Sequence, residues 1–378
     1  MIRARIALPL VLLAAAVPAG AGVLPDDRAD VLYHRYDGGG VTIDGPSLLV
    51  RKKFAEKYGV TANYYIDMVS SASIDVVTTA SPYKEERTQG SLAFDMLNGK
   101  SQYSLSFTNS DENDYTANSL SFDVSQDMFG DLTTVSFGFS RGWDEVRKRG
   151  DDTFVEPVDR RTYRVGVSQI VTPSLMMGLS YELVSDEGFL NNPYRSVRYL
   201  DPESPAGYTY QPEAYPHTRT SSAASVRARY FLPYRAAVSG EYRYFTDTWG
   251  IGAHTAEITY THPWTERWIF ELGLRFYTQD AANFYSDLFP YADAQNFLAR
   301  DKELASMTSM TLGFGLAYEF KPGRLEFLDK AALNFRYDRI HFDYDDFRDL
   351  RVTGVPPGTE PLYTFDADVI RVYFSGWF

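Results

Sequence analysis

The segment Gly59–Val69, with the sequence GVTANYYIDMV, has the residue pattern that decides the fold. Apolar residues occupy its even-numbered positions, and most of the residues between them are polar. The apolar residues are Val60, Ala62, Tyr64, Ile66 and Met68, and the polar ones include Thr61, Asn63 and Asp67. Successive side chains of a β-strand point to opposite faces, so this segment is predicted to be a strand with one apolar and one polar face.

The same alternation recurs along the rest of the chain. The 28 Tyr and 25 Phe residues are spread throughout, and they recur at every second position within short stretches. Fourteen strands are predicted from residue 60 onward, at 60–69, 86–96, 100–108, 115–124, 132–142, 161–169, 174–183, 219–230, 235–245, 254–261, 267–277, 306–319, 331–341 and 364–378. Strands of about 9 to 11 residues have the length that a tilted crossing of a bilayer requires.

The connections between these strands alternate between short and long. Turns such as Asn98–Gly99 alternate with longer segments at 70–85, 143–160, 184–218, 278–305 and 342–363. Short turns on one side and long loops on the other are typical of outer-membrane barrels. A soluble β-sandwich would explain the alternation but not the bulky aromatic residues on nearly every strand. We therefore predict an all-β protein, a transmembrane antiparallel up-and-down β-barrel of 14 to 16 strands, in the outer membrane of a Gram-negative bacterium.

One face of the predicted strands carries nearly all of the charged side chains, eight Arg and nine Asp or Glu. The residues singled out for the lumen are Arg227, Arg229, Arg243, Arg275, Arg336, Glu241, Glu257 and Glu271. Arginine binds a carboxylate through two parallel hydrogen bonds, so ion pairs between strands narrow a lumen, whereas a wide pore leaves its charges separated. The pattern favours a narrow or gated channel for ligand passage. Glu241 is expected to pair with Arg229, and Arg243 with Glu257.

The composition excludes several other classes of protein. The 378-residue chain has 37 Lys and Arg against 50 Asp and Glu, a formal net charge of -13 and no Cys. A mean hydropathy of -0.30 argues against a helical membrane protein, and the negative charge argues against nucleic acid as a partner. The lack of Cys excludes disulfides and a lipid anchor. Residues 1–21 are expected to be a signal peptide, because Arg3 and Arg5 precede an apolar core and a small-residue cleavage site.

After residue 21, the N-terminal and C-terminal parts of the chain differ in how regularly apolar and polar residues alternate. Residues 22–58 depart from simple alternation and are predicted to form either a strand pair, 47–54 with 31–36, or a segment inside the barrel. Residues 59–378 are predicted to form the barrel. The final aromatic strand ends on Phe378 and resembles the signal that barrel-assembly machinery reads. The C-terminus is therefore expected in the periplasm, with that machinery, outer-membrane lipid and lipopolysaccharide as partners.

Three segments resemble a family of proteobacterial proteins of uncharacterised function. They are DRADVLYHRYDGGGVTIDGPS at 27–47, SSASIDVVTTASPYKEER at 70–87 and SRGWDEV at 140–146. The resemblance implies an outer-membrane β-barrel. Members of that family tend to be encoded beside thioredoxin-like proteins, a small lipoprotein and a flavin transferase, so the resemblance also implies a flavin transferase and thioredoxin-like proteins as partners.

A short motif in the second of these segments is similar to the acceptor site of flavin transferases. That motif reads Asp, two free positions, Ser or Thr, usually Gly, then Ala, then the Thr or Ser that takes FMN in phosphoester linkage. The matching residues here are Asp75, Thr78, Ala80 and Ser81, whereas Thr79 stands where Gly is usual. The alternative function is therefore a flavinylated outer-membrane redox component, with covalent FMN on Ser81.

Signals for an enzyme are weaker. Residues 138–142 match G-x-S-x-G, but no helix is predicted to follow, as a nucleophile elbow requires. The five His residues have no metal-ligand spacing. A barrel protease or lipase needs a His beside a carboxylate or Ser at the rim. His254, or His341 beside Asp343, Asp345 and Asp346, would supply it. No catalytic activity and no metal site are predicted.

Overall fold

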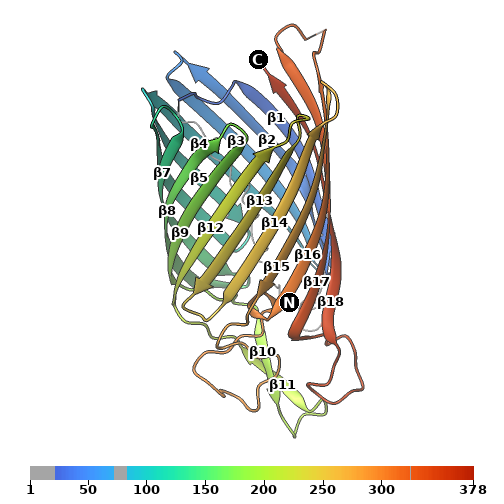
Figure 1. Cartoon of the computed structure of the whole chain (residues 1–378). Helices are drawn as coiled ribbons and strands as arrows, with labels where there is room; N and C mark the ends of the chain where they lie inside the picture. Colours follow the sequence, from blue (N-terminus) through green and yellow to red (C-terminus); the bar gives the residue numbers. More distant parts are fainter. Residues whose placement is uncertain (1–21, 72–82, 324) are drawn as a thin grey trace.

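The wall of the molecule is a closed antiparallel β-barrel (Figure 1). The computed structural model describes residues 22–71, 83–323 and 325–378. Sixteen strands follow one another around the wall in the order β1, β18 down to β12, and β9 down to β2. Pairing of β1 with β18 closes the barrel, with Arg28 opposite Trp377. The fold prediction is confirmed at the higher of its two strand numbers.

The strands are long, as a tilted barrel wall requires. The first part of the wall consists of β1 (Arg28–Gly38), β2 (Val41–Phe54), β3 (Tyr58–Ser71), β4 (Tyr83–Asn98), β5 (Ser101–Glu112), β6 (Tyr115–Met128), β7 (Thr133–Lys148), β8 (Asp151–Thr172) and β9 (Leu175–Gly188). The second part consists of β12 (Thr218–Phe231), β13 (Ala237–Asp247), β14 (Gly252–Pro263), β15 (Trp268–Gln279), β16 (Met307–Phe320), β17 (Lys330–Arg348) and β18 (Leu362–Trp377).

Three short elements lie outside the wall. The strands β10 (Ser196–Leu200) and β11 (Tyr208–Pro212) form a separate two-stranded sheet. The 3-10 helix η1 (Lys302–Leu304) is the one helix in the described part of the chain. Within the described ranges, no helix is long and apolar enough to cross a membrane.

The N-terminal segment is part of the wall. β1 and β2 pair with each other from Gly38 opposite Val41 to Arg28 opposite Arg51, so the segment forms a strand pair and the alternative of a luminal segment is wrong. The barrel starts at Arg28 and not at residue 59. Pairing between β2 and β3 is interrupted at 45–46, with the same register on both sides of the gap. A Cβ atom at Gly45 would lie 1.8 Å from the Ile66 carbonyl oxygen, so this close approach requires glycine.

All fourteen strands predicted from residue 60 onward are present, and several are longer than predicted. The largest difference is at 143–160, which was expected to be a long loop. β7 continues to Lys148 and β8 starts at Asp151, so these residues form an extended hairpin around a turn at 149–150. These strand residues were not predicted because many of their side chains are charged. Apolar alternation marks only the strand residues that face a bilayer or a core.

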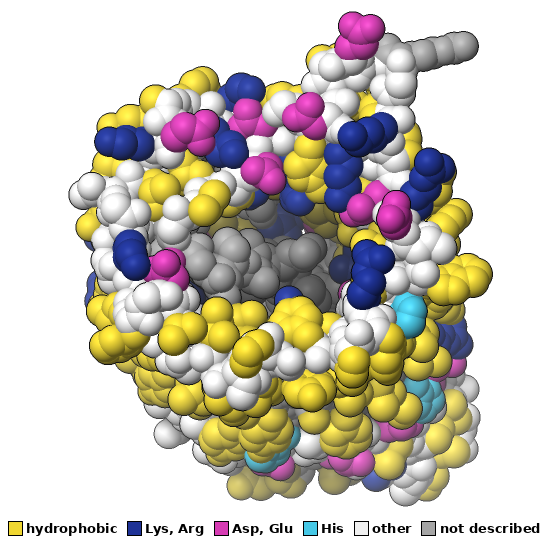
Figure 2. Space-filling model, turned by 45° about the horizontal axis from the view of Figure 1, so that its top comes forward, with side chains coloured by type: hydrophobic (Ala, Val, Ile, Leu, Met, Phe, Trp, Pro, Cys, Tyr) yellow, Lys and Arg dark blue, Asp and Glu magenta, His cyan; other side chains and the backbone are white. Residues whose placement is uncertain are grey.

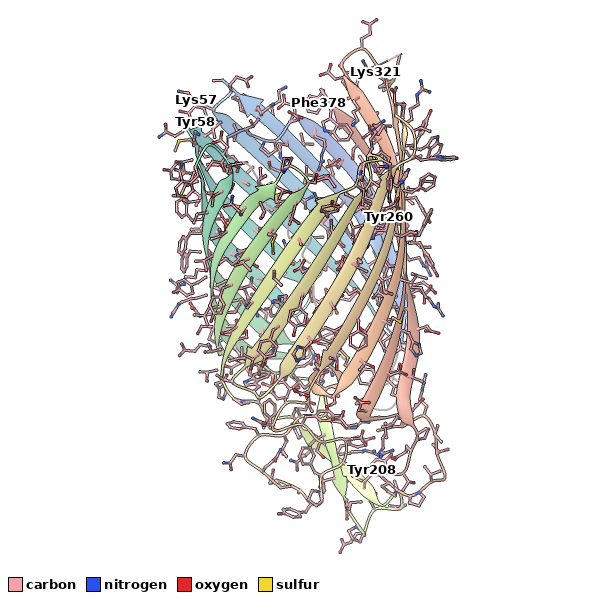
Figure 3. All side chains as sticks on the ribbon, viewed as in Figure 1. Lys57, Tyr58, Tyr208, Tyr260, Lys321 and Phe378 are labelled. Carbon is pink, nitrogen blue, oxygen red and sulfur yellow. The ribbon has the colours of Figure 1, made fainter. Side chains whose placement is uncertain are left out.

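The two ends of the barrel differ in their connections. One end, here called the turn end, carries only short connections, at 55–57, 99–100, 129–132, 173–174, 232–236, 264–267 and 321–329. Lys57, Lys321 and Phe378 lie at this end in Figure 3. At the opposite end, here called the loop end, the described residues form three long connections, at 189–217, 280–306 and 349–361.

The outer surface of the wall is apolar and its inner surface is polar. On β15, for example, Leu272, Leu274 and Phe276 are each at least 41% exposed, so Glu271 and Arg275, which alternate with them, face the interior. Figure 2 looks onto the turn end and shows hydrophobic side chains over the outer wall, Lys, Arg, Asp and Glu around the rim, and a hollow at the centre.

Candidate functional site

The inner wall brings together most of the charged residues predicted for the lumen. Each of the eight alternates along its strand with exposed apolar residues and therefore faces the interior. On β12, for example, Arg227 and Arg229 lie between the outward Val226 and Tyr230, which are 37% and 50% exposed. The inner wall of the second part of the barrel is the first component of the candidate site.

The pairing of these charges differs from the expected one. Glu241 accepts a hydrogen bond of 2.7 Å from Nε of Arg227 and not from Arg229. The strand register explains the difference, because Arg227 lies directly opposite Glu241, whereas Arg229 lies opposite Ser239 and donates to its hydroxyl at 3.1 Å. The expected pair of Glu241 with Arg229 is therefore wrong.

Arg243 and Arg275 also have partners other than those expected. Arg243 reaches across β12 to Glu182 on β9 at 3.4 Å, so the expected pair with Glu257 is wrong. Glu257 lies opposite Arg275 in the strand register and accepts a hydrogen bond from Thr259 at 3.4 Å. The guanidinium of Arg275 lies 5.9 Å from the ring centre of Tyr277, and within the described ranges it makes no ion pair.

A row of ion pairs crosses four neighbouring strands of the inner wall. Arg336 on β17 binds Glu271 on β15, and its Nε lies 3.1 Å from Asp338. Asp338 in turn binds Arg371 on β18. We call Glu271, Arg336, Asp338 and Arg371 the luminal row. It can cross β16 because two glycines there leave room for it. Gly315 lies between Glu271 and Arg336 in the strand register, and a Cβ atom at Gly313 would lie 2.5 Å from the Asp338 carboxylate.

The row continues into the N-terminal strands, where sequence reasoning assigned no role to His34. His34 on β1 lies opposite Arg371 on β18. Its Nε2 lies 2.8 Å from Asp67 and 3.0 Å from the Tyr65 hydroxyl. Arg87 on β4 lies 4.0 Å from Asp67. The sequence indicates that His34, Asp67 and Arg87 share the polar face of their strands, because the opposite face of each strand carries apolar residues. The role of His34 was not predicted, because the pattern of residues 22–58 allows both a strand pair and a luminal segment.

One group of carboxylates in the described part of the chain has the spacing to hold a metal ion. Single oxygen atoms of Glu85, Glu112 and Asp114 lie within 4.8 Å of one another. Nε of Arg87 lies 3.7 Å from Glu112 and supplies part of the counter-charge. Carboxylate oxygens suit a hard cation such as Ca²⁺, but groups of acidic residues at strand ends are common without one.

The second component of the candidate site is formed by the three long connections of the loop end. We call residues 189–217, 280–306 and 349–361 together the loop cap. The sheet of β10 and β11 belongs to it and extends away from the barrel, with Tyr208 near its far end (Figures 1 and 3). Single β-bridges join Tyr199 to Phe289 and Ala214 to Leu298, so the first two connections are held together by backbone pairing.

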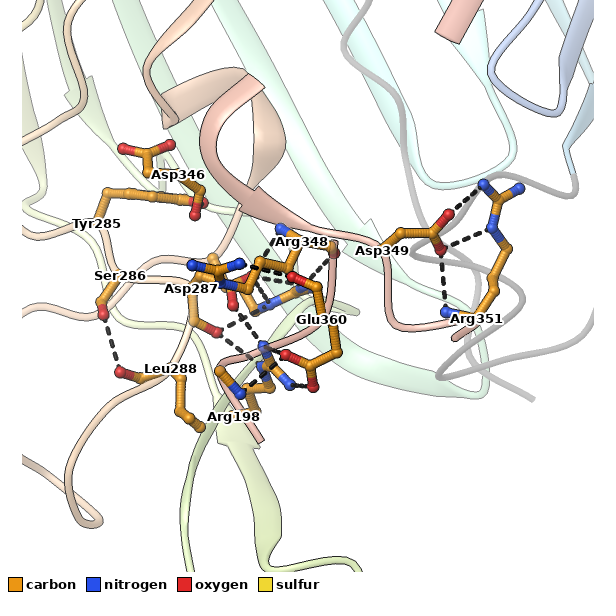
Figure 4. A network of polar contacts seen from close by, with 12 residues as sticks. Arg198, Tyr285, Ser286, Asp287, Leu288, Asp346, Arg348, Asp349, Arg351 and Glu360 are labelled. Atoms are coloured by element: carbon orange, nitrogen blue, oxygen red, sulfur yellow. Dashed lines mark hydrogen bonds and ion pairs between the residues drawn. The ribbon is translucent and has the colours of Figure 1, made fainter. Parts of the chain in front are cut away.

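A buried arginine ties all three connections of the loop cap together (Figure 4). Arg198, on β10, is fully buried. Its Nε donates to the Asp287 carbonyl at 2.9 Å, Nη2 binds the Asp287 carboxylate, and Nη1 donates to Glu360 at 2.6 Å. Burial works against ionisation of Glu360, but the hydrogen bonds from Arg198 outweigh it and hold the pKa of this carboxyl below its usual value.

Asp287 is the centre of this network. Besides Arg198 it binds Nη2 of Arg300 at 2.8 Å and the backbone N–H of Arg348 at 3.2 Å. The Arg300 guanidinium also lies 4.4 Å from the ring centre of Phe347, which is fully buried. Charges that are buried, paired and hydrogen-bonded in this way fix one arrangement of the loops, because breaking a single pair leaves a buried charge uncompensated.

An aromatic cluster fastens the loop cap to the rim of the barrel. Tyr215 and Phe284 of the cap pack against Trp249, which lies in the turn between β13 and β14, with ring centres 5.5 and 5.2 Å from that of Trp249. The indole N–H of Trp249 donates to the Thr218 carbonyl at 3.0 Å. The cap is therefore a folded part of the molecule and not a set of separate loops.

Two other predicted sites have different outcomes. The flavin-acceptor motif, Asp75 to Ser81, lies outside the described residues, so flavinylation stays a prediction. His341 lies on the outer face of β17, and its two ring nitrogens lie 3.1 Å from Asp343 and 2.8 Å from Asp366. Since both nitrogens contact carboxylates, neither is directed at a serine or water as a general base requires.

The fold is that of bacterial outer-membrane β-barrel proteins. A structure described as a bacterial polysaccharide outer membrane secretin matches with a TM-score of 0.52 and 7% identity, over 94% of this chain and all of that one. The siderophore receptor PirA from Pseudomonas aeruginosa matches with a TM-score of 0.45 and 9% identity, over 86% of this chain, which spans 60% of the receptor. A FadL homologue from Pseudomonas aeruginosa matches with a TM-score of 0.45 and 8% identity, over 95% and 92% of the two chains.

The chain belongs to a family of proteins of unknown function, DUF3570. The family model matches residues 73–158 and 158–337, which is more than half of the chain. The segment 27–47, on which part of the resemblance rests, lies before this match. No curated protein matches the sequence.

Proposed function

We propose that the protein is an outer-membrane channel with a narrow, charged lumen, through which a small polar solute passes. The loop cap controls access at the loop end, which faces the cell exterior. The C-terminal strand, with Phe378, faces the periplasm and is the part that the barrel-assembly machinery captures. Catalysis is not part of this proposal.

The luminal row is the observation that carries the proposal. Glu271, Arg336, Asp338 and Arg371 are bound to one another across the inner wall instead of standing apart in water. Glycine at 313 on β16 leaves room for these bridges, so a row of ion pairs takes up space that a wide pore would leave to water. This arrangement supports a narrow path.

The balance of charge on the inner wall bears on what passes. Arginine and carboxylate side chains alternate there, and most are paired, so neither sign dominates the field along the path. A lumen of this kind favours solutes that are polar or zwitterionic over simple anions or cations. We therefore expect weak ion selectivity.

Single-channel recording in planar bilayers tests the proposal. The wild-type protein is expected to conduct weakly, and Arg336→Ala is expected to raise the conductance severalfold because it opens the bridge to Glu271. Arg275→Ala is the matched control, since this luminal arginine has no ion pair within the described ranges. It is expected to shift selectivity towards cations with little change in conductance.

Two outcomes would contradict the proposal. A large and steady wild-type conductance that Arg336→Ala leaves unchanged would mean that the luminal row does not restrict the path. A protein that inserts into bilayers but gives no conductance with either variant would mean that the barrel is not a channel.

A further inference from the structure

Two arginines lie side by side on the outer surface of the barrel, on the neighbouring strands β7 and β8. Arg141 on β7 is directly opposite Arg161 on β8. Both occupy the outward-facing positions of their strands, in line with apolar residues: Phe137 and Val165 on the same face are 45% and 48% exposed. The side chains of Arg141 and Arg161 are 56% and 47% exposed, and their positions on the outward face direct them away from the lumen.

Within the part of the chain that the structure describes, the two arginines share a single ion-pair partner. Both guanidiniums bind the same residue, Asp159, at 2.7 Å from Arg141 and 3.0 Å from Arg161. Glu145 is engaged with Arg147 at 2.5 Å. Glu187 on β9 lies opposite Asp159 and makes no ion pair within the described ranges. Like charges directly opposite each other on two strands are destabilising, and one carboxylate offsets only half of this charge.

An apolar groove starts at the arginine pair. It has a volume of about 460 Å³ and lies on β5, β6 and β7. Its lining residues are Leu105, Leu120, Phe122, Phe139, Arg141 and Trp143. Trp143 is 43% exposed and its ring centre lies 6.3 Å from that of Phe107. Arg141 therefore places a positive charge at the edge of a surface that is otherwise apolar.

A second depression lies on the other side of Trp143. Its volume is about 410 Å³, and its lining is more polar. The lining residues include Thr116, Asn118, Trp143, Glu145 and Asp159. An indole between an apolar groove and a polar depression is suited to a ligand with both kinds of surface, because aromatic rings with a polar group favour such boundaries.

We propose that this surface binds a phosphorylated, acylated glycolipid of the outer leaflet. Its phosphate lies between Arg141 and Arg161, an acyl chain lies in the apolar groove, and the sugar lies against Trp143 and the polar depression. Guanidinium groups bind phosphate oxygens in pairs, which supplies the missing negative charge. The inference rests on the proposed outer-membrane location and orientation, but not on the passage of a solute.

Another charged region of the outer wall lacks these features. On β17 and β18, Arg339 lies 2.8 Å from Asp366 and 2.6 Å from Asp368. His341 binds Asp366 and Asp343 in the same region. Carboxylates outnumber cations there, so that region would repel a phosphate, and the arginine pair on β7 and β8 is the better match.

Binding of defined lipids to the purified full-length protein tests the inference. The probes are lipid A, dephosphorylated lipid A and phosphatidylglycerol, with binding measured by native mass spectrometry. Lipid A is expected to bind at least tenfold more tightly than either of the others. The double variant Arg141→Gln/Arg161→Gln should lose at least tenfold in lipid A affinity. Arg147→Gln is the matched control, because Arg147 is equally exposed but already paired, and it should leave binding unchanged.

A further variant works in the opposite direction and does not depend on loss of function. Asp159→Asn removes the carboxylate that competes with the phosphate, so it should raise lipid A affinity at least twofold. Equal lipid A binding by the wild type and the double variant would overturn the inference, as would weaker binding by Asp159→Asn. Equal binding of phosphatidylglycerol would overturn the glycolipid assignment. Failure of the protein to insert into bilayers at all would instead contradict the proposed function.

Discussion

Glu213 illustrates how burial and neighbouring charges set the protonation of a single carboxyl group. It lies in the loop cap and is buried. Burial is the largest influence and Asp301 adds to it, and together they raise the pKa of Glu213 to about 7 against the opposing influence of Arg195. The backbone N–H of Arg300 at 2.8 Å and the Tyr215 hydroxyl at 2.9 Å favour the ionised form but do not outweigh burial.

The raised pKa makes the stability of the loop cap depend on pH. A carboxyl group that holds its proton more tightly when folded contributes stability below its ordinary pKa of 4.5, and this contribution is lost as pH rises to about 7. The cap is therefore expected to open more often at pH 8 than at pH 5. Hydrogen exchange of residues 196–212, corrected for the intrinsic effect of pH, measures this. Glu213→Gln should remove most of the pH dependence.

Asp349 provides the control for this experiment. Its hydrogen bond from Arg351 lowers the pKa of Asp349 below its ordinary value of 3.8. Its contribution to stability is therefore present above that value and does not change between pH 5 and pH 8. Asp349→Asn should leave the pH dependence of exchange intact. If Glu213→Gln left it intact as well, burial of Glu213 would not be its cause.

The long connections of the loop end depend on one another. Arg198 binds Asp287 and Glu360, which are 89 and 162 residues away in the sequence. Each of the three residues comes from a different connection. Loss of any one of them therefore affects the other two connections as well, although the barrel beneath has its own hydrogen-bonded strands.

Arg198→Met tests this dependence. The substitution leaves the Asp287 and Glu360 carboxylates buried with too little positive charge, and removal of one partner from a buried ion pair costs about 3 to 5 kcal/mol. Hydrogen exchange and protease cleavage should increase in all three connections of the cap. The heat-dependent gel migration of the barrel should not change.

Arg351→Met is the matched control. Arg351 also binds a carboxylate, Asp349, but its side chain is 50% exposed, and exposed pairs contribute at most about 1 kcal/mol. Its effect on the cap should be small. Similar effects of the two substitutions would mean that Arg198 does not hold the three connections together.

The strands could be predicted from the sequence, whereas the loop cap could not. Alternation along β15 or β16 is a local pattern, set by a wall with one apolar and one polar side. The contacts of Arg198 follow no local pattern, because they depend on how distant loops meet. For the luminal ion pairs, the sequence predicted which face of each strand the charged residues occupy. It did not predict the partners of Arg243 and Glu241, because these depend on the strand register. The N-terminal strands were ambiguous because three consecutive glycines at 38–40 and the Gly45–Pro46 pair obscure the alternation of apolar and polar residues.

The long connections that the structure describes all emerge at one end of the barrel. The cap connections 189–217, 280–306 and 349–361 lie at the loop end, and Lys57, Lys321 and Phe378 lie at the turn end (Figure 3). The proposed orientation places the cap outside the cell. An epitope inserted at 203–204, in the connection between β10 and β11, should bind antibody on intact cells.

An epitope in the short turn at 264–267 is the control for orientation. It should become accessible only after the outer membrane is permeabilised. The reverse result would place the cap in the periplasm. It would then also move the arginine pair on β7 and β8 to the inner leaflet, where phosphorylated glycolipid is scarce.

The closure of the barrel by β1 and β18 determines the order in which the molecule can form. Neighbouring strands such as β13 and β14 are joined by a few residues and can pair as soon as they are made, but β1 must wait for the last strand of the chain. Glu360 lies two residues before β18, so its buried ion pair with Arg198 awaits the same final segment. Joining distant parts of a chain carries the largest loop-closure entropy. The seam and the cap are therefore late steps of assembly, and an incomplete chain exposes two unpaired strand edges and an unlocked cap at the same time.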